Sequence, residues 1–308
     1  MIAPALSVTH QHLLSVVATE FVRPAAARPV RILDAGCGDG LLLDYFAQNM
    51  GKIYPGVTFE FYGFDVSDHR VQAPGYFQDT VAILSRNHPY MPWSERLALI
   101  SESDAWPWPP DQFDVIISNQ VMEHVRNHRL FFSEIFRTLR PDGFSVHVFP
   151  LRHVLVEPHL HLPLVHRIRN RDLLRRSIHF LSRLGLGKYD PAQESLDSYA
   201  ERHAAYLLTN VNYLTSRNVL KLAAESELHA DFRYTPQYYL AKLRAILSRA
   251  PTLHYRRGGP QGGDKLASAL LKYLASVTLV VVKQMSPAGT GRNPKGEWNG
   301  TQYPIKPG

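Results

Sequence analysis

The first half of the chain alternates short apolar runs with segments whose apolar residues recur every three or four positions. Short apolar or alternating runs predict strands, and the wider spacing predicts helices. Strands are expected at residues 30–33, 59–65, 97–100, 113–118 and 144–149. Helices are expected at residues 10–21, 41–49 and 131–139. The run at 113–118 is typical of a strand inside a parallel sheet.

The second half opens with a basic amphipathic segment at 167–184 and then resumes the alternation. Further elements are expected as helices at 215–228, 239–247 and 265–274 and as strands at 230–234 and 278–283. Thr215 or Ser216 would cap the first of these helices. An Arg-Pro-Asp-Gly sequence at 140–143 predicts a turn. The tail from Ser286 has no periodicity, and we expect it to be mobile.

One motif lies between the strand at 30–33 and the helix at 41–49, where the chain reads Asp34-x-Gly36-x-Gly38-x-Gly40. Glycines supply positive φ angles and let a backbone approach a ligand closely, and the start of a helix presents N–H groups to polar ligands. A dinucleotide-binding turn has another spacing, G-x-G-x-x-G. The acid and its glycines, with Cys37 between them, resemble motif I of the class I S-adenosylmethionine-dependent methyltransferases. A glycine-rich turn without a ligand is the alternative.

This resemblance implies a binding site for S-adenosylmethionine along the following strands. Asp65, which ends the second strand, would accept hydrogen bonds from both ribose hydroxyls, and Val66 would lie beside the adenine. Alternatively, Asp65 only caps the next helix. After the third strand, Asp104 and Ala105 match the family's acid and small residue, where the acid accepts a hydrogen bond from the adenine amine.

The segment after the fourth strand, residues 119–125, resembles the short sequence motif with which a helix begins below the methyl-transfer site in this family. Asn119 and Gln120 would lie close to the cofactor. His124 has the side chain suited to take a proton from a hydroxyl near neutral pH. The alternative is that His124 packs against the helix and takes no part in catalysis.

The order of these motifs implies the fold: a seven-stranded, doubly wound, Rossmann-like α/β sheet that is mostly parallel, with an inserted, mostly helical lid. In this family the last strand inserts antiparallel between its neighbours. Residues 1–149, with an N-terminal helix, would form the cofactor-binding core, and 215–285 its C-terminal part. Residues 150–214 would form the substrate lid, and 286–308 a flexible tail.

The composition of the 308 residues is ordinary for a globular protein, with 45% hydrophobic and 20% charged residues. The longest apolar run, 277–282, is too short to cross a bilayer, and the N-terminus lacks the pattern of a secretory signal. The single cysteine excludes an internal disulfide. These features predict a cytoplasmic protein.

The net charge of +7 raises nucleic acid as a partner. However, residues 119–122 lack the Asn/Asp-Pro-Pro-aromatic tetrad typical of methyltransferases that act on base amines, so we expect no nucleic-acid substrate. The basic excess is local, because residues 151–190 hold eight Lys or Arg against three acids. The helix expected at 167–184 would be solvated, attract a phosphate-bearing substrate or contact a membrane surface.

The lid begins with Glu157, His159 and His161. Two histidines at alternating positions of an extended chain point to one side. We expect them to contact the substrate or act as the general base. Structural hydrogen bonding is the second hypothesis, and a metal site with Glu157 is the third.

The favoured function is O-methylation of a small-molecule or sugar-containing acceptor by direct displacement, with His124 or a lid histidine as base and no metal. An inserted lid such as residues 150–214 often selects the acceptor, but the sequence does not identify which acceptor it is. A catalytically inactive, cofactor-binding scaffold or regulatory subunit is the alternative. A dehydrogenase is disfavoured by the glycine spacing.

Overall fold

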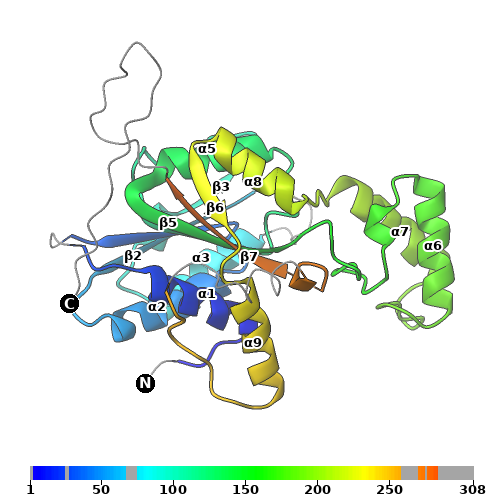
Figure 1. Cartoon of the computed structure of the whole chain (residues 1–308), viewed down its shortest axis with the longest axis horizontal. Helices are drawn as coiled ribbons and strands as arrows, with labels where there is room; N and C mark the ends of the chain where they lie inside the picture. Colours follow the sequence, from blue (N-terminus) through cyan, green and yellow to red (C-terminus); the bar gives the residue numbers. More distant parts are fainter. Residues whose placement is uncertain (1–2, 25–27, 67–74, 258–269, 275, 284–308) are drawn as a thin grey trace, which may run out of the picture.

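The computed structural model describes residues 3–24, 28–66, 75–257, 270–274 and 276–283, and its centre is one seven-stranded sheet (Figure 1). The strands are β1 (Val30–Ala35), β2 (Phe59–Val66), β3 (Leu97–Ile100), β4 (Phe113–Asn119), β5 (Leu139–Pro150), β6 (Leu228–Asp231) and β7 (Ser276–Lys283). Their order is β3-β2-β1-β4-β5-β7-β6. Only β7 runs antiparallel to its neighbours, β5 and β6. The expected α/β sheet and its inserted last strand are therefore confirmed.

Helices cover both faces of this sheet, and successive strand residues alternate between them. Ile32 packs on one side with α1 (Val8–Glu20), α2 (Leu41–Ile53), α3 (Tyr76–Asn87), α4 (Trp93–Arg96) and α9 (Thr235–Ile246). Leu33 packs on the other side with α5 (His128–Thr138) and α8 (Ser216–Glu225). Because β1 and β4 are parallel, their carboxyl ends lie at one edge of the sheet, and from there the chain enters helices on opposite faces, α2 after β1 and α5 after β4.

Several element boundaries differ from those that the sequence predicts. The turn expected at 140–143 lies inside β5, where Phe113 pairs with Leu139 and Val115 pairs with Phe144. Extra residues on one strand form a bulge, and a Cβ at Gly143 would lie 2.8 Å from the carbonyl oxygen of Asp114. The strand expected at 230–234 is β6, and α9 begins at Thr235 rather than 239. Half of the helix expected at 265–274, and the tail, lie outside the described residues.

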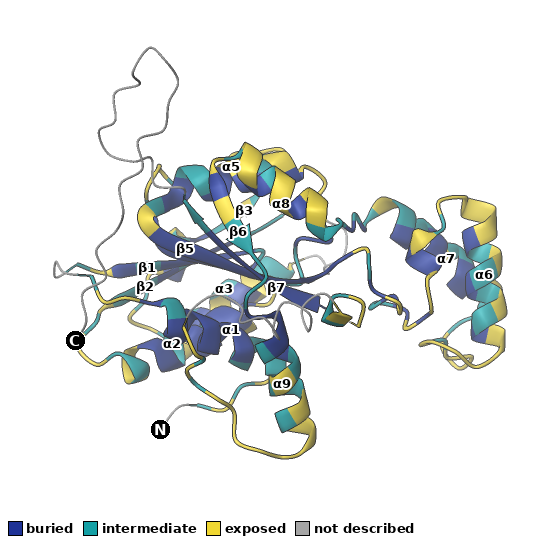
Figure 2. Cartoon of the chain, in the orientation of Figure 1, coloured by how far each residue is buried: buried dark blue, intermediate teal, exposed yellow. Residues whose placement is uncertain are grey.

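Between β5 and α8 the chain leaves the sheet and forms a third hydrophobic cluster, separate from the two on the sheet faces (Figures 1 and 2). A single 3-10 turn (Val165–Arg167) precedes α6 (Arg171–Arg183), so the helix begins four residues later than expected, and α7 (Leu196–Thr209) returns. The two helices bury Leu174, Ile178, Ala200 and Ala204 against each other. We call residues 151–214 the lid segment. No helix in the described part of the chain is long and apolar enough to span a membrane.

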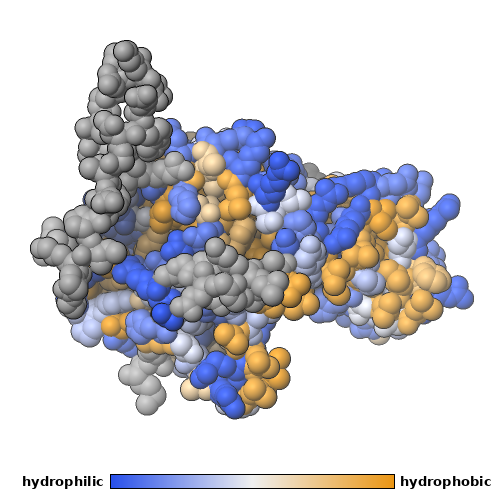
Figure 3. Space-filling view, viewed as in Figure 1, coloured by the Kyte–Doolittle hydropathy of each residue, from blue (hydrophilic) through white to orange (hydrophobic). Residues whose placement is uncertain are grey.

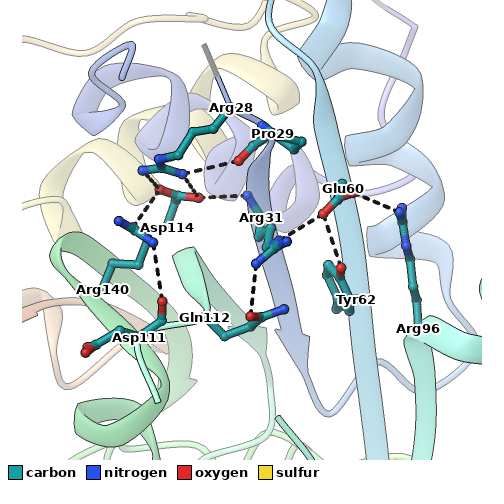
Figure 4. Close-up of polar contacts among 10 residues, drawn as sticks. All are labelled: Arg28, Pro29, Arg31, Glu60, Tyr62, Arg96, Asp111, Gln112, Asp114 and Arg140. Carbon is teal, nitrogen blue, oxygen red and sulfur yellow. Dashed lines mark hydrogen bonds and ion pairs between the residues drawn. The ribbon is translucent and has the colours of Figure 1, made fainter. Parts of the chain in front are cut away.

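A network of charged side chains joins the amino ends of β1, β2 and β4 (Figure 4). Asp114 accepts two hydrogen bonds from Arg28, at 2.5 and 2.9 Å, and one from the backbone N–H of Arg31. The Arg31 side chain donates to Glu60, which Arg96 also contacts. These contacts fix the sheet edge opposite the glycine-rich turn, so the acids there are structural.

Candidate active site

The glycine-rich turn connects β1 to α2 at the carboxyl edge of the sheet. Gly36, Gly38 and Gly40 have φ angles of 87°, 50° and 75°, which favour glycine. A Cβ at Gly36 would lie 2.5 Å from a methyl carbon of Val121. The N–H groups of Gly36 and Cys37 both donate to the carbonyl oxygen of Phe64 at 2.9 Å, which ties the turn to β2.

A cavity of about 330 Å³ opens over this turn. Ten of the predicted site residues line it: Asp34, Gly36, Cys37, Gly38, Asp65, Val66, Asp104, Asn119, Gln120 and His124. Gly40 does not; its N–H bonds to the Cys37 carbonyl, and a Cβ there would meet Thr80 and Leu84 of α3. Ala105 is exposed beside the lining residue Trp106 and is also outside the lining. Of the twelve site residues predicted in the core, ten therefore line the cavity, and Gly40 and Ala105 do not.

Two of the acidic side chains that line the cavity come from the ends of β1 and β2. Asp65 accepts hydrogen bonds at 2.7 Å from the N–H groups of Gly38 and Val66, so β2 and the turn hold it in place. Asp34 is buried, and burial together with the nearby charge of Asp65 raises its pKa well above the usual value. Among the described residues, Asp34 Oδ1 and Asn119 Oδ1 have no hydrogen-bond partner. Buried oxygens of this kind, lining a cavity, fit a ligand that carries hydrogen-bond donors.

Cys37 also lies in this turn, and its side chain is buried. Burial, followed by the charges of Asp34 and Asp65, raises the pKa of its thiol well above the usual value. A neutral thiol is a poor nucleophile. Its small, buried side chain fills the space under the turn.

Gln120 follows β4 with a positive φ of 55°, which is unusual for a residue with a side chain. Its N–H donates to the carbonyl of Val148, and its side-chain amide donates to Ser276 on β7 at 3.0 Å. Bonds to β5 and β7 thus hold this conformation. Strained backbone maintained in this way is concentrated at functional sites.

The segment at 121–125 forms a turn rather than the start of a helix, and α5 begins only at His128. This turn binds the end of the lid segment. His124 Nδ1 lies 2.8 Å from the carbonyl oxygen of Asn210, and Asn212 donates to the carbonyls of Glu123 and Val125. Because a carbonyl only accepts, His124 Nδ1 carries a proton in this contact. The turn beside the cavity therefore also positions the lid.

Glu123 is buried inside this contact. Burial, with a smaller contribution from the charge of Glu157, raises its pKa to about 8. Its Oε2 has no hydrogen-bond partner among the described residues. Glu123 is thus neutral at pH 7, in contrast to an exposed glutamate.

The two lid histidines do not point to one side, and that expectation is wrong. Residues 158–160 form a turn in which the N–H of His161 donates to the Glu157 carbonyl, and His161 has a φ of 56°. His161 is exposed, whereas the ring of His159 lies 5.3 Å from that of His124. Neither lines the cavity. In the described ranges, no group of three or more His, Cys, Asp or Glu side chains could hold a metal ion.

Sequence reasoning missed several residues of the cavity wall, among them His10, Glu102, Arg126 and Asn127. His10 comes from α1, which the sequence predicts as a helix that could cover the cofactor. Burial lowers its pKa, partly offset by Asp39. Tertiary packing brings these residues to the site, so no local pattern marks them.

Comparison with known proteins places the chain in a family. A model of the methyltransferase domain matches residues 10–225. The chain is 31% identical over 123 residues to a ubiquinone biosynthesis O-methyltransferase of Agrobacterium fabrum, covering 39% of this chain and 42% of that protein. It is 24% identical over 148 residues to the Rhodopseudomonas palustris protein of that name, covering 44% and 51%. The chain spans about half the length of these curated relatives.

Among solved structures, the chain resembles PKMT2 from Rickettsia typhi in complex with AdoHcy, with a TM-score of 0.49 and 14% identity over 92% of this chain and 55% of that one. A TM-score below 0.5 adds nothing to the assignment. The domain match covers more than half of the chain, and the sheet has the expected strand order. The chain therefore belongs to the class I S-adenosylmethionine-dependent methyltransferases.

Proposed function

We propose that this chain methylates an oxygen atom of a small-molecule or sugar-containing acceptor. The observation that carries the proposal is the position of His124, which lines the same cavity as the acid–glycine turn and has its Nδ1 anchored to the Asn210 carbonyl. An imidazole oriented in this way can accept the proton of a hydroxyl acceptor through Nε2. The name of the curated relatives, O-methyltransferase, also favours oxygen.

The cavity residues fit S-adenosylmethionine as the methyl donor. When bound, it supplies a methyl group on a positively charged sulfur, which is a good leaving group. Asp34 and the turn at 36–38 would hold one end of it, Asp65 and Val66 the ribose, and Asp104 the adenine side. Asn119 and Gln120 would line the site of transfer. The walls would orient the two reactants, which lowers the entropic part of the barrier.

We further propose that the outer face of α6 contacts an anionic membrane surface. Leu173, Phe180 and Leu184 are 55 to 62% exposed on this face. Arg176 and Arg183 lie between them and have no ion pair with any described acid, whereas Arg171 and Arg175 pair with acids of α7. Exposed apolar side chains mixed with unpaired arginines match the chemistry of an anionic lipid interface. Figure 3 shows apolar and polar surface intermixed on this part of the molecule.

Calorimetric titration with S-adenosylhomocysteine tests the cofactor site. We expect micromolar binding to the wild-type chain and its loss in Gly38→Arg and Asp65→Ala. Asp142→Ala is the matched acid control, because Asp142 is exposed at the opposite edge of the sheet. A folded wild-type chain that does not bind would contradict the proposal.

Transfer of a labelled methyl group to a panel of phenols, catechols and sugars tests the reaction. We expect His124→Asn to lower the turnover of any oxygen acceptor while leaving cofactor affinity unchanged. Tight cofactor binding without turnover anywhere in the panel would favour the scaffold hypothesis instead.

A further inference from the structure

A group of positively charged side chains lies at the base of the lid segment. Arg152 and Arg167 belong to the lid segment and are exposed, and the partly exposed Lys272 belongs to residues 270–274, just before β7. Figure 1 shows these last residues, in orange, between the sheet and the lid segment. None of the three side chains lines the cavity of the active site. The proposed function therefore does not use them.

The three cations gather around one imidazole, that of His153. Arg152 precedes His153 in the chain, and the guanidinium of Arg167 donates to the His153 carbonyl at 3.0 Å. The Lys272 ammonium lies 5.3 Å from the centre of the Tyr273 ring, which in turn lies 5.7 Å from the His153 ring. Burial lowers the pKa of this imidazole, and the charges of Lys272, Arg167 and Arg152 lower it further. All three charges thus act on the same small region.

This cluster has no acidic partner in the part of the chain that the structure describes. None of its three cations forms an ion pair with a described residue. Glu157 is close in sequence, but it is completely buried and already accepts hydrogen bonds from within the lid segment. Like charges held together repel one another and destabilise a compact fold. A bound anion would remove this repulsion.

The cations also have hydrogen-bond donors to offer. Arg167 uses only Nη2, which donates to the carbonyls of His153 and Val154, and its Nε and Nη1 have no bond to a described residue. Guanidinium and ammonium groups are strong donors to phosphate oxygens. A phosphate monoester carries about −1.5 to −2 charges near neutral pH. It therefore neutralises more of this cluster than a singly charged diester does.

Exposed apolar side chains flank the cations on the same two segments. Leu155, Leu164, Leu270 and Leu274 are 43 to 62% exposed. The N–H of Leu155 donates to the Tyr273 carbonyl at 2.9 Å, and the N–H of Leu164 donates to the Leu155 carbonyl at 2.9 Å, so the two segments lie side by side. Figure 3 shows hydrophobic surface where the orange turn before β7 lies in Figure 1. Apolar surface beside unpaired cations matches an amphiphilic anion.

We infer that Arg152, Arg167 and Lys272 form a binding site for the phosphate group of an apolar phosphate monoester, whose hydrocarbon part lies against the four flanking leucines. The two guanidinium groups and the ammonium donate to the phosphate oxygens, and no covalent bond changes. This site goes beyond the proposed function and does not depend on it, because its cations lie outside the cavity wall.

Histidine NMR of the full chain tests the site, with dihexanoyl phosphatidic acid below its critical micelle concentration as the probe. The signal of His153 is assigned from His153→Asn. We expect the probe to raise the pKa of His153 by about 1 pH unit, because a nearby negative charge favours the imidazolium. No change in this pKa would overturn the inference and show that water alone solvates the cluster.

Removing two of the cations tests which groups bind the phosphate. In Arg152→Gln with Lys272→Gln, the pKa of His153 should already be raised without the probe, and binding should weaken at least about tenfold because charged hydrogen bonds are lost. Lys52→Gln with Arg86→Gln, two exposed cations of α2 and α3, is the matched control and should bind as the wild type does. Equal weakening in both double variants would overturn the site, because it would show a general effect of net charge.

Two further probes test the class of ligand. Inorganic phosphate should bind at least about tenfold more weakly than phosphatidic acid, because it buries no apolar surface, and Leu270→Ser with Leu274→Ser should reduce that difference. Dihexanoyl phosphatidylglycerol, a diester with the same chains, should also bind more weakly. Equal binding of inorganic phosphate would overturn the apolar part of the inference, and equal binding of the diester would overturn the monoester. Titration with S-adenosylhomocysteine should give the wild-type affinity in all these variants, so a failure of this site is distinguishable from a failure of the proposed function.

Discussion

The sheet core and the lid segment each bury one glutamate at their common boundary, and the two behave in opposite ways. Burial raises the pKa of Glu123, in the turn after β4, to about 8. The pKa of Glu157, at the base of the lid, is lowered although its side chain is equally buried. The difference lies in the donors. Three hydrogen bonds reach Glu157, whereas Glu123 Oε2 has no partner among the described residues.

In this pair, hydrogen-bond donors and the charge of His159 lower the pKa of Glu157, whereas burial dominates the pKa of Glu123. The ionised Glu157 also raises the pKa of its neighbour Glu123. One boundary thus holds one charged and one neutral acid. The charged acid contacts His159, while the neutral acid lies in the turn at 121–125, which contacts Asn210 and Asn212.

The largest expected effect is on the pH dependence of stability, through Glu123→Gln. The unfolded chain ionises Glu123 near its usual pKa of 4.5, whereas the folded chain keeps it protonated up to about 8. Wild-type stability is therefore lost as the pH rises between these values, by on the order of 3 kcal/mol, and the variant should lack this loss. Urea unfolding at pH 5 and pH 8 measures the difference. Parallel curves for the two proteins would contradict the raised pKa.

Glu157→Gln should show the opposite sign and a smaller effect. Its lowered pKa means that ionised Glu157 stabilises the fold above the usual pKa of 4.5, and that this contribution is lost as the pH falls. At pH 7 we expect the variant to be less stable by roughly 2 kcal/mol, because buried donors lose a charged acceptor. The same urea series extended below pH 4.5 should bring the two proteins together. A gap that widens in acid would reverse the assignment of charge.

Gly36→Val should affect the core alone. A side chain at this positive φ costs about 1–2 kcal/mol, and its Cβ would lie 2.5 Å from Val121. We expect at least a tenfold loss of affinity for S-adenosylhomocysteine. Gly56→Val, at a positive φ with no atoms near the added Cβ, is the matched control and should bind normally.

The sequence predicts the core far better than the lid for a physical reason. The acid–glycine turn depends on neighbouring residues, so its φ angles and the cavity above it follow from local spacing. The pairing of Glu157 with Tyr213 and the binding of Asn210 by His124 join distant segments, and no local period marks them. Periodicity alone predicts that His161 points to the same side as His159. The positive φ of His161 instead changes the direction of the chain at this point.

The smallest expected effect concerns the outer face of α6, far from either glutamate. Leu173→Ser with Phe180→Ser should change the free energy of unfolding by no more than about 0.5 kcal/mol per site, because both side chains are mostly exposed. Cofactor affinity should remain that of the wild type. Co-sedimentation with phosphatidylserine vesicles at low salt should fall several-fold.

Leu243→Ser with Ile246→Ser, on the exposed apolar face of α9, controls for loss of apolar surface in general. Because arginine attraction to anionic lipid is screened by salt, wild-type binding should vanish at high ionic strength. A wild-type chain that stays in the supernatant at low salt would show that this face is solvated, and the lid would then serve the acceptor site alone.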